Sequence, residues 1–379
     1  MKSEAAGQGD AAAIRVLYLF DTTDRAESES VIEMARRGVV PTIVCQPDAP
    51  MRERFVEAGL DVVPVAMRTK ADPRAIAALR RLRRERTFDL VHAYYKVALT
   101  NYQLAGLSPS LPRLPVVAYR GIIGNLSYFD PFSWLSFLDP RIERIVCVCE
   151  AIRQYFLHKS LVPGVRLFRP ERVATIHKGH RCEWYRQAQP QLPTDLQIPP
   201  GAPVIGCVAR LKKRKGIVEL IRAFEQLPAA LNAYLVLVGR VEYAAITQAA
   251  AASPAADRIR LTGFRRDAPQ IAGAFTIKTL PSLRREGLPR AVIEAMAQGI
   301  PAVVSDSGGN PELVEEGVSG RVTPAGDIEA LRAALEQLLA DPRLRRRMGV
   351  AAERRIRDHF TVERTAEETL ALYRAVLQR

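Results

Sequence analysis

The chain alternates short apolar runs with helix-like segments, and it does so twice. The runs lie at 14–20, 39–45, 61–66, 89–94, 115–120, 144–149 and 172–177 in the first series, and at 204–209, 233–239, 258–263, 275–280, 301–306 and 320–324 in the second. Segments with a helical pattern, such as SESVIEMARRG, lie between most of them. Continuous apolar strands separated by helices are typical of a parallel sheet with helices on both faces. The sequence therefore predicts an α/β protein with two doubly wound sheets in series.

A weakly periodic stretch rich in proline and glutamine, residues 182–203, separates the two series and is interpreted as an interdomain linker. A length of 379 residues suits two domains of roughly 180 residues each. We predict domains at 1–185 and 186–360, followed by a C-terminal helix at 361–379. Ligands of doubly wound sheets bind beyond the carboxyl ends of the strands, in this case in a cleft between the two domains. Chemistry is therefore expected in the loops that follow the strands.

Composition limits the partners and the compartment. The chain carries 55 Lys and Arg against 41 Asp and Glu, a net charge of +14, which favours nucleotide phosphates, nucleic acid or an anionic membrane surface as partners. Six arginines lie on one helix predicted at 74–89, whose basic face is either solvated or docks on anionic lipid. No run approaches the about 18 apolar residues of a membrane span, and the first 13 residues resemble a short disordered lead rather than a signal peptide. We therefore expect a cytoplasmic protein, either free or peripheral on the inner face of the plasma membrane.

Most of the five cysteines lie in apolar runs. Cys147 and Cys149 alternate in IVCVCE, which predicts that both lie on one face of a strand. Because no further metal-binding side chains are near them, we expect buried, reduced thiols and no metal site.

Cations follow the first strand of the second series. Arg210 comes directly after the strand at 204–209, and Lys215 lies in the run LKKRKG just before a helix. Fixed cations beside a helix N-terminus make a phosphate site, in which arginine forks onto two oxygens and lysine acts as a point charge. Such a run is also typical of a solvated turn. Its place at a strand end of a doubly wound domain favours phosphate binding.

Two acids follow a later strand, in the stretch LRREGLPRAVIEAMAQG. Glu286 and Glu294 lie eight residues apart, with Pro289 between them in the first turn of a predicted helix. In one interpretation Glu294 is a surface residue and Glu286 a partner of the helix dipole. In the other, the two carboxylates accept hydrogen bonds from the hydroxyl pairs of two polyols, such as a sugar and a ribose. A third loop, after the next strand, carries Gly308 and Gly309, which allow backbone to approach a ligand closely.

These loops resemble those of a known enzyme family. The segments GCVARLKKRKGIVELIRAFEQL, PSLRREGLPRAVIEAMAQGIPAVVSDSGGNPELVEEGVSGRV and LLADPRLRRRMG are similar to the C-terminal half of the GT-B glycosyltransferases of family 4. The E-x7-E pattern of that family is matched by Glu286 and Glu294. The resemblance implies a GT-B fold, with two Rossmann-like domains facing a cleft and a last helix that crosses back to the N-terminal domain. It also implies that the N-terminal domain binds the acceptor and the C-terminal domain the nucleotide sugar.

The resemblance further implies a reaction and a set of roles. The reaction is a retaining transfer of a hexose from a nucleotide-diphosphate sugar to a hydroxyl of a saccharide or lipid-linked acceptor, with no metal or other cofactor. By position, Arg210 and Lys215 would bind the donor diphosphate and stabilise the leaving group. Glu286 would contact the donor sugar and Glu294 the ribose. The remaining donor-site positions would be Gly287, Leu288, Gly308 and Gly309.

The N-terminal half departs from the family pattern. After the first strand the family has a glycine pair, where this chain has FDTTDRAESES. After the fifth strand Arg120 and Gly121 stand where the family often has His-Gly, so no histidine role is carried over. Arg120 either approaches the donor or an anionic acceptor, or it forms a structural ion pair. His92, near the end of another strand, is a further candidate for the cleft.

The segment NLSYFDPFSWLSFLDP, residues 125–140, is rich in aromatic side chains. It is either a packed insert or an amphipathic patch that touches a bilayer at the acceptor entrance. Together with the basic helix at 74–89, it makes a lipid-linked or lipopolysaccharide-type acceptor our leading expectation, and with it a role in cell-surface polysaccharide or lipopolysaccharide synthesis.

Other functions compete with this one. A nucleotide-sugar epimerase or hydrolase of the same fold would act without an acceptor, and a non-catalytic sugar-nucleotide binder would account for the missing N-terminal glycines. Nucleic acid is not expected as a partner, because no binding motif is present and the basic clusters are spread over both halves. A nicotinamide dehydrogenase is disfavoured because no GxGxxG follows the first strand.

Overall fold

The structure is a computed structural model that describes residues 13–378 except 125, 128, 163–164 and 187–188. The lead predicted from the sequence therefore lies outside the described residues, apart from its last position. The contacts within the chain divide it into two compact units. The first unit comprises Met1–Tyr119, Leu126–Val146 and Ala366–Arg379, and the second comprises Arg120–Asn125 and Cys147–Thr365.

The first sheet has seven strands in the order β3-β2-β1-β4-β5-β6-β9. These strands are β1 (Ile14–Phe20), β2 (Val39–Cys45), β3 (Asp61–Pro64), β4 (Leu90–Tyr94), β5 (Val116–Arg120), β6 (Ile142–Cys147) and β9 (Val173–Thr175). The β1–β2, β1–β4, β2–β3 and β4–β5 pairs are all parallel. Up to β6, this is the 3-2-1-4-5-6 order of a Rossmann-like doubly wound sheet, which confirms the predicted fold.

The second sheet repeats that order. It runs β12-β11-β10-β13-β14-β15, and every neighbouring pair is parallel. Its strands are β10 (Val204–Val208), β11 (Tyr234–Val238), β12 (Ile259–Gly263), β13 (Ile277–Leu280), β14 (Ala302–Ser305) and β15 (Gly320–Thr323). The strand order reverses between β10 and β13. A crevice opens at such a reversal, beyond the carboxyl ends of the strands, and doubly wound sheets bind their ligands there.

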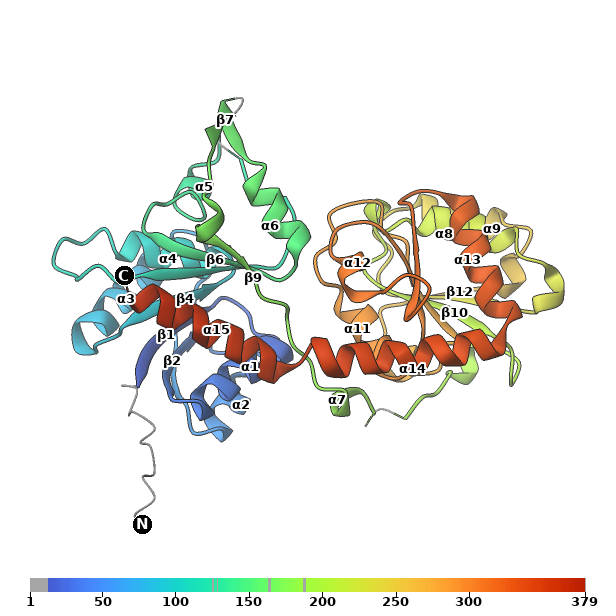
Figure 1. The fold of residues 1–379 in the computed structure, drawn as a ribbon, viewed down its shortest axis with the longest axis horizontal. Coiled ribbons are helices and arrows are strands. Elements are labelled where there is room, and N and C mark those ends of the chain that lie inside the picture. Colours follow the sequence, from blue (N-terminus) through green and yellow to red (C-terminus); the bar gives the residue numbers. More distant parts are fainter. Residues whose placement is uncertain (1–12, 125, 128, 163–164, 187–188, 379) are drawn as a thin grey trace, which may run out of the picture. The chain divides into compact units, whose positions relative to one another are not determined.

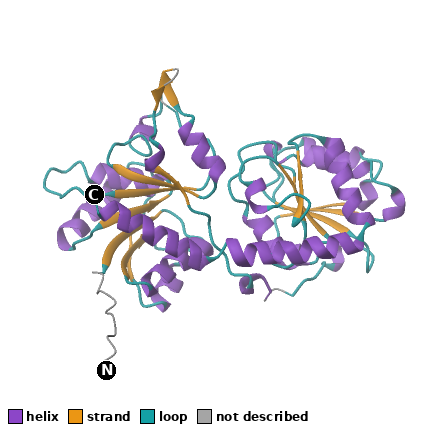
Figure 2. Ribbon diagram, viewed as in Figure 1, coloured by secondary structure: helices purple, strands orange, loops and turns teal. Residues whose placement is uncertain are grey.

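Helices surround each sheet (Figures 1 and 2). They are α1 (Arg25–Arg36), α2 (Arg52–Glu57), α3 (Pro73–Glu85), α4 (Lys96–Ala105), α5 (Pro131–Trp134), α6 (Glu150–Leu157), α7 (Glu183–Arg186), α8 (Ile217–Glu225), α9 (Ala245–Ala252), α10 (Ala268–Gly273), α11 (Arg290–Met296), α12 (Asn310–Leu313), α13 (Ile328–Ala340), α14 (Pro342–His359) and α15 (Val362–Leu377). Local sequence explains where several begin. Asp72 and Asp341 each accept hydrogen bonds from first-turn N–H groups, and the proline that follows each fits the first helical position.

Successive side chains along the strands of the second sheet belong alternately to two separate apolar clusters. In β10 and β11, Ile205 and Leu235 belong to a large core cluster, whereas their neighbours Val204 and Val236 belong to a second cluster on the other face. Since side chains point alternately to the two faces of a strand, both faces of this sheet are buried. That is why its strands appear in the sequence as unbroken apolar runs.

The last helix returns to the first unit. From Ala366 onward, α15 is part of that unit, and the buried hydroxyl of Tyr373 donates to the Tyr18 hydroxyl at 3.1 Å. The same oxygen lies 2.6 Å from Nδ1 of His92 on β4. Burial lowers the pKa of His92 to about 3, so the ring is neutral at physiological pH. The interpretation of His92 as a cleft residue is therefore wrong, because its side chain is a core partner of the C-terminal helix.

Local details of the prediction are also corrected. β6 ends at Cys147, and Cys149 is the N-cap of α6, so the two thiols do not share one strand. All five cysteines are free and buried, which confirms the expected reduced thiols. A short antiparallel hairpin of β7 (Ser160–Val162) and β8 (Val165–Arg166) was not predicted. It escaped detection because strands of two or three residues carry no readable periodicity.

Candidate active site

The candidate residues of the second half gather where the second sheet reverses its strand order. Arg210 and Lys215 follow β10, and Glu286 follows β13, the strand that neighbours β10 in the sheet. Lys215 and Glu286 are 71 residues apart in sequence, yet the parallel pairing of β10 with β13 brings their loops together. The sequence could place each residue at a strand end. Only the strand order places the two loops side by side.

A buried ion pair forms the centre of this site. Nζ of Lys215 lies 2.9 Å from Oε1 and 2.7 Å from Oε2 of Glu286. Lys215 is 8% exposed and Glu286 is 7% exposed. The hydroxyl of Ser282 donates to Oε2 of Glu286 at 2.7 Å. The carboxylate of Glu286 is thus held by three hydrogen bonds, and its interpretation as a mere dipole partner at a helix N-terminus does not describe it.

Two arginines lie beside this ion pair, Arg214 on the loop after β10 and Arg285 on the loop after β13. Nη1 of Arg214 donates to the carbonyl of Arg285 at 3.2 Å and lies 3.9 Å from Oε2 of Glu286. Arg285 itself has φ = 61°, in the left-handed region that side chains other than glycine seldom adopt. Strain of this kind persists where the surrounding contacts fix the backbone, and it is frequent at functional sites.

A network of buried polar side chains fixes the loop between β13 and α11, which carries Glu286. The Ser305 hydroxyl at the end of β14 donates to the carbonyl of Ser282 at 2.5 Å. Nδ2 of Asn310, at the start of α12, lies 3.4 Å from the Ser305 hydroxyl. All three side chains are buried, so each hydrogen bond replaces solvent in a dry environment. Ser282, Ser305 and Asn310 were not singled out in the sequence, although Ser282 immediately follows the proline that ends the β13 run.

The glycine pair after β14 serves backbone contact within the protein. Gly308 has φ = 63°, and a Cβ at this position would lie 1.9 Å from the carbonyl oxygen of Glu286. A Cβ at Gly309 would lie 2.5 Å from the carbonyl oxygen of Gly287. The pair therefore lets the loop after β14 press against residues 286–287. In the structure these glycines admit the loop that carries Glu286, and the donor contact predicted for them from the sequence stays a prediction.

Glu294 lies one helical turn inside α11. Nε of Arg290 pairs with Oε1 of Glu294 at 3.1 Å, and the Arg290 side chain is exposed. Burial raises the pKa of Glu294, while the charges of Arg290 and Lys278 act in the opposite direction. The carboxylate is therefore largely enclosed, which argues against a plain surface residue. Leu288, between the two acids, packs against the large core cluster of the unit.

Lys278 is an unexpected neighbour of Glu294. It lies on β13, is fully buried, and its Nζ has no hydrogen-bond partner among the described residues. Burial lowers its pKa from the ordinary 10.5 to about 8, and the negative charge of Glu294 opposes that shift. The signal was present in the sequence as a lysine inside the apolar run FTIKTL. Periodicity alone could not tell whether it pointed outward.

Arg210 differs from Lys215 in being exposed. Its charge acts on Glu242, whose pKa is lowered mainly by a hydrogen bond from Lys212. The guanidinium of Arg210 is therefore available to a ligand at the end of β10. Lys215, in contrast, is already engaged by Glu286, so a phosphate would have to share it.

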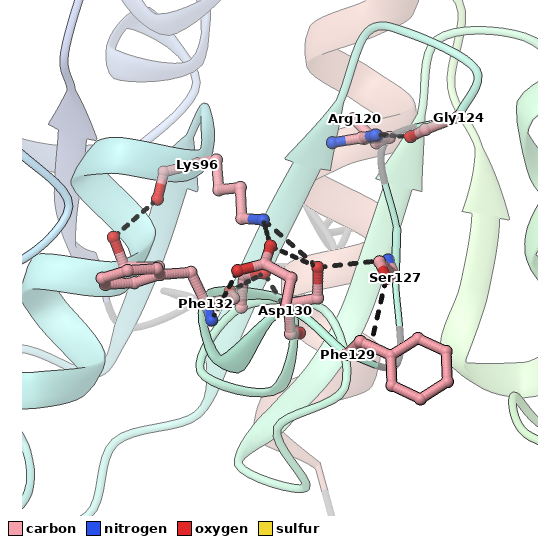
Figure 3. A network of polar contacts seen from close by, with 10 residues as sticks. Lys96, Arg120, Gly124, Ser127, Phe129, Asp130 and Phe132 are labelled. Atoms are coloured by element: carbon pink, nitrogen blue, oxygen red, sulfur yellow. Dashed lines mark hydrogen bonds and ion pairs between the residues drawn. The ribbon is translucent and has the colours of Figure 1, made fainter.

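Arg120 braces its own loop. Its guanidinium donates from Nε to the carbonyl of Ile122 at 3.0 Å and from Nη2 to the carbonyl of Gly124 (Figure 3). The side chain is buried, and burial lowers its pKa from the ordinary value. These contacts order the loop after β5. The donor contact predicted for Arg120 stays a prediction.

The aromatic segment after that loop is partly packed and partly exposed. Nζ of Lys96 pairs with Asp130 at 2.7 Å, and Asp130 also accepts a hydrogen bond from Ser133 (Figure 3). Phe137 is buried, whereas Phe129 is 97% exposed and its ring lies away from this network. Trp134 is also exposed, and Tyr128 lies outside the described residues. The segment is thus not a fully packed insert, and its helix α5 spans only four residues. The predicted contact of an amphipathic patch with a bilayer stays a prediction.

The described part of the chain contains neither a cluster of metal-binding side chains nor a membrane-spanning helix. No three His, Cys, Asp or Glu side chains there gather in a way that could hold a metal ion. None of the helices described there has the length and apolar character needed to span a bilayer.

Comparison with known proteins identifies the family. Residues 28–179 match the model described as "Glycosyl transferase 4-like domain", and residues 188–355 match the model described as "Glycosyl transferases group 1". The chain belongs to the family 4-like GT-B glycosyltransferases. This confirms the resemblance inferred from the loops, and it extends family membership to the N-terminal half, where the motifs were least faithful.

Other members of this glycosyltransferase family give the range of relatives. The lipopolysaccharide core biosynthesis mannosyltransferase LpcC of Rhizobium leguminosarum is 35% identical over 185 residues, covering 47% of this chain and 52% of that protein. A GDP-mannose-dependent phosphatidylinositol monomannoside mannosyltransferase of Mycolicibacterium smegmatis is 35% identical over 159 residues, covering 39% of this chain and 42% of that protein. The chain thus spans about half the length, or less, of these curated relatives.

Among solved structures, HepE of Anabaena in complex with UDP is similar over 96% of this chain and 100% of its own. The TM-score is 0.73 at 21% sequence identity, so this similarity concerns the fold. The observed strand orders and this likeness together establish the GT-B fold.

Proposed function

We propose that this protein is a retaining glycosyltransferase that moves a hexose from a nucleotide-diphosphate sugar to a hydroxyl of a saccharide or glycolipid. The observation that carries the proposal is the buried Lys215–Glu286 pair at the strand-order reversal of the second sheet. A buried carboxylate held in one orientation can accept hydrogen bonds from sugar hydroxyls without reorganisation. A cation beside it can meet the phosphate that joins the sugar to its nucleotide.

The proposed reaction uses these charges on the leaving group. The bond from the anomeric carbon to the β-phosphate oxygen breaks, and its electron pair stays on the departing diphosphate. Arg210 and Lys215 would stabilise the charge that grows there, which lowers the barrier because the cations are already in place. The acceptor oxygen forms the new bond to the same face of the anomeric carbon, and its proton passes to a phosphate oxygen. Glu286 would orient the sugar, and Glu294 the ribose.

The donor pocket would be completed by backbone. Gly287 and Leu288 would line it beside Glu286. The loop at Gly308 and Gly309 would fix their position through its close contact with the backbone of residues 286–287. We assign donor binding to residues 186–360 and acceptor binding to residues 1–185. No metal is included in the proposal, because the cations of the chain itself can neutralise the diphosphate.

For the acceptor we propose a lipid-linked or lipopolysaccharide-type saccharide on the cytoplasmic side of a membrane. LpcC acts in lipopolysaccharide core biosynthesis by its name, and the mycobacterial relative is named for a phosphatidylinositol mannoside. The exposed Phe129 and Trp134 would touch the bilayer, together with the basic surface of α3. Flotation with vesicles checks this, and binding that does not respond to anionic lipid would contradict it.

The donor base is tested by calorimetric titration with UDP, GDP, ADP and CDP. Tight binding of one nucleotide selects the sugar donors for acceptor screening, and NMR of the product then reports whether the anomeric configuration is retained. An inverted product would overturn the retaining mechanism. Release of free sugar or of an epimer without any acceptor would favour the hydrolase or epimerase alternative.

A further inference from the structure

A cavity lies in the first unit, at the edge of the first sheet where its parallel strands β5 and β6 begin. Its volume is about 520 Å³. It is lined by the C-terminal ends of α3 and α4, by residues 112–116 before and at the start of β5, and by Val376 of α15. Pro140, Arg141 and Glu143, around the start of β6, complete the lining. Because the strands are parallel, the start of β5 lies at the amino edge of the sheet. The cavity is therefore separate from the loops that follow the strands.

Two buried hydrogen-bond donors in its lining have no partner among the described residues. They are Nε of Arg83, in the last turn of α3, and Nε2 of Gln103, in the last turn of α4. Arg83 is 7% exposed and Gln103 is 1% exposed. Donors buried without an acceptor are rare in folded proteins, because the lost hydration is not replaced. Both would be satisfied by an acceptor placed in the cavity.

Two guanidinium groups converge on the same point. A Cβ built on Gly106 would lie 3.4 Å from Nη1 of Arg141 and 3.5 Å from Nη1 of Arg83. The Arg83 guanidinium also lies 5.1 Å from the centre of the Tyr102 ring, which holds it in place from one side. The absent side chain at Gly106 thus leaves room between two cationic forks. Paired guanidinium groups of this kind recognise phosphate and carboxylate groups.

The charges around the cavity differ in how far they are already neutralised. Arg141 is paired with Asp139, with Nη2 to Oδ2 at 2.6 Å. No carboxylate within the described ranges pairs with Arg83, whose Nη2 donates to the carbonyl of Pro112. Arg113 adds an exposed cation to the lining, and Glu143 adds one acid. The site retains an unneutralised buried cation, which is costly unless an anion approaches it.

A structural role explains part of this arrangement. Arg80 donates to the carbonyls of Leu104 and Ala105, and Arg141 donates to the carbonyl of Gln103. These bonds satisfy the C-terminal carbonyls of α4, as basic side chains often do. They account for Arg80 and Arg141. They leave Nε of Arg83 and the amide of Gln103 without a function.

We propose that this cavity binds a phosphate monoester or a carboxylate carried by a small organic molecule. Arg83 and Gln103 would donate to its oxygens, with Arg141 adding charge across Gly106. Leu114, Pro115 and Val376 give the cavity apolar walls that suit an organic body. The source is either a soluble metabolite or the headgroup of an anionic lipid, since both present the same phosphate chemistry.

The test is calorimetric titration of the full chain with phenyl phosphate at constant ionic strength, in buffer free of phosphate and sulfate. Arg83→Met and Gln103→Leu each remove one of the two side chains that carry an unpartnered donor, and each is expected to weaken binding by at least about tenfold. Arg81→Met is the matched control, because Arg81 lies on the same helix with an 80% exposed side chain and outside this cavity. Arg210→Ala is the second control. It tests whether phenyl phosphate binds at the proposed donor site instead, and removing this exposed side chain leaves no buried charge unpaired. Both controls are expected to bind as the wild type does.

Gly106→Ala tests the same point without removing any polar group. The backbone there has φ = −74°, which alanine adopts freely, and the added methyl would occupy the space between the two guanidinium groups. It is expected to weaken phenyl phosphate binding while the thermal melting curve stays that of the wild type. If Arg83→Met fails to fold, this variant and Gln103→Leu still decide the matter.

Several outcomes would overturn the proposal: no binding by the wild type, unchanged binding by Arg83→Met and Gln103→Leu, or loss of binding in Arg210→Ala alone. A vesicle arm identifies the source. Phosphatidylcholine vesicles with and without phosphatidic acid are mixed with the protein. Binding that needs phosphatidic acid, is displaced by phenyl phosphate and is lost in Arg83→Met supports a lipid headgroup, whereas phenyl phosphate binding without vesicle binding supports a soluble phosphate.

Discussion

Replacing Glu286 by alanine should damage the fold as well as the reaction. The substitution removes the acceptor of two hydrogen bonds from Lys215 and one from Ser282. It also leaves the ammonium group of Lys215, 8% exposed, without its counter-charge. Breaking a buried pair on one side typically costs about 3–5 kcal/mol, because the remaining charge stays desolvated. Such a loss is a large part of the about 5–15 kcal/mol that separates folded from unfolded domains.

The assay is urea unfolding of the purified variants, followed by circular dichroism, beside a transfer assay with the donor identified by titration. Glu286→Ala is expected to unfold at markedly lower urea and to lose transfer. The double variant Glu286→Ala/Lys215→Met removes the stranded charge and should recover most of the lost stability, without recovering activity.

Glu367→Ala, an exposed glutamate of α15, is the control and should shift stability by less than about 0.5 kcal/mol. If Glu286→Ala unfolds at the same urea concentration as the wild type, the pair contributes nothing to stability and the reasoning from its burial is refuted. If the double variant is no more stable than Glu286→Ala, the loss has a cause other than the unpaired lysine.

Three further predictions concern the same half of the chain. Arg210→Ala should weaken binding of the preferred nucleoside diphosphate by about tenfold while leaving stability unchanged, because the side chain is exposed; unchanged affinity in the titration would remove Arg210 from the phosphate site. Lys278 is fully buried with its pKa lowered from 10.5 to about 8, so the unfolded chain binds more protons between these values. Stability should therefore rise with pH across that window, by up to about 3 kcal/mol relative to Lys278→Met, and parallel pH profiles of urea unfolding would contradict this. Gly308→Ala places a Cβ 1.9 Å from the carbonyl oxygen of Glu286 and should cut transfer by at least about tenfold. Gly317→Ala is the control, because Gly317 has a similar positive φ but nothing within 4 Å of its added Cβ; it should cost only about 1 kcal/mol of backbone strain and keep activity. Equal activity losses in the two variants would show that the contact between Gly308 and Glu286 is unimportant.

Much of the architecture was readable because it rests on local pattern. The thirteen predicted strands all correspond to strands of the two main sheets, with ends that differ by a few residues. Apolar runs buried on both faces need no knowledge of their neighbours to be recognised. The loop residues were found for a related reason, since ligands of doubly wound sheets meet the carboxyl ends of strands and those ends are visible in the sequence.

The direction in which a side chain points was harder to predict from the sequence. His92 was assigned to a cleft from its place near a strand end, but it contacts Tyr373, which is 281 residues away in sequence. Arg83 appeared as one of several arginines on a solvated or lipid-facing helix, yet it is buried beside Tyr102. Helical periodicity gives the angular position of a side chain around the helix axis. It does not say which other element covers that angle.

By itself, the sequence determined the class of fold, the strand ends at which chemistry was to be sought, and the family to which those loops belong. Only the tertiary structure decided that Lys215 and Glu286 form a buried pair, that Ser282 completes it, and that Gly308 supports the loop from behind. The physical reason is the same in each case. Strand and helix patterns arise from neighbours along the chain, whereas a contact between residues 71 positions apart depends on the order in which parallel strands pair, and strand order leaves no periodic signal in the sequence.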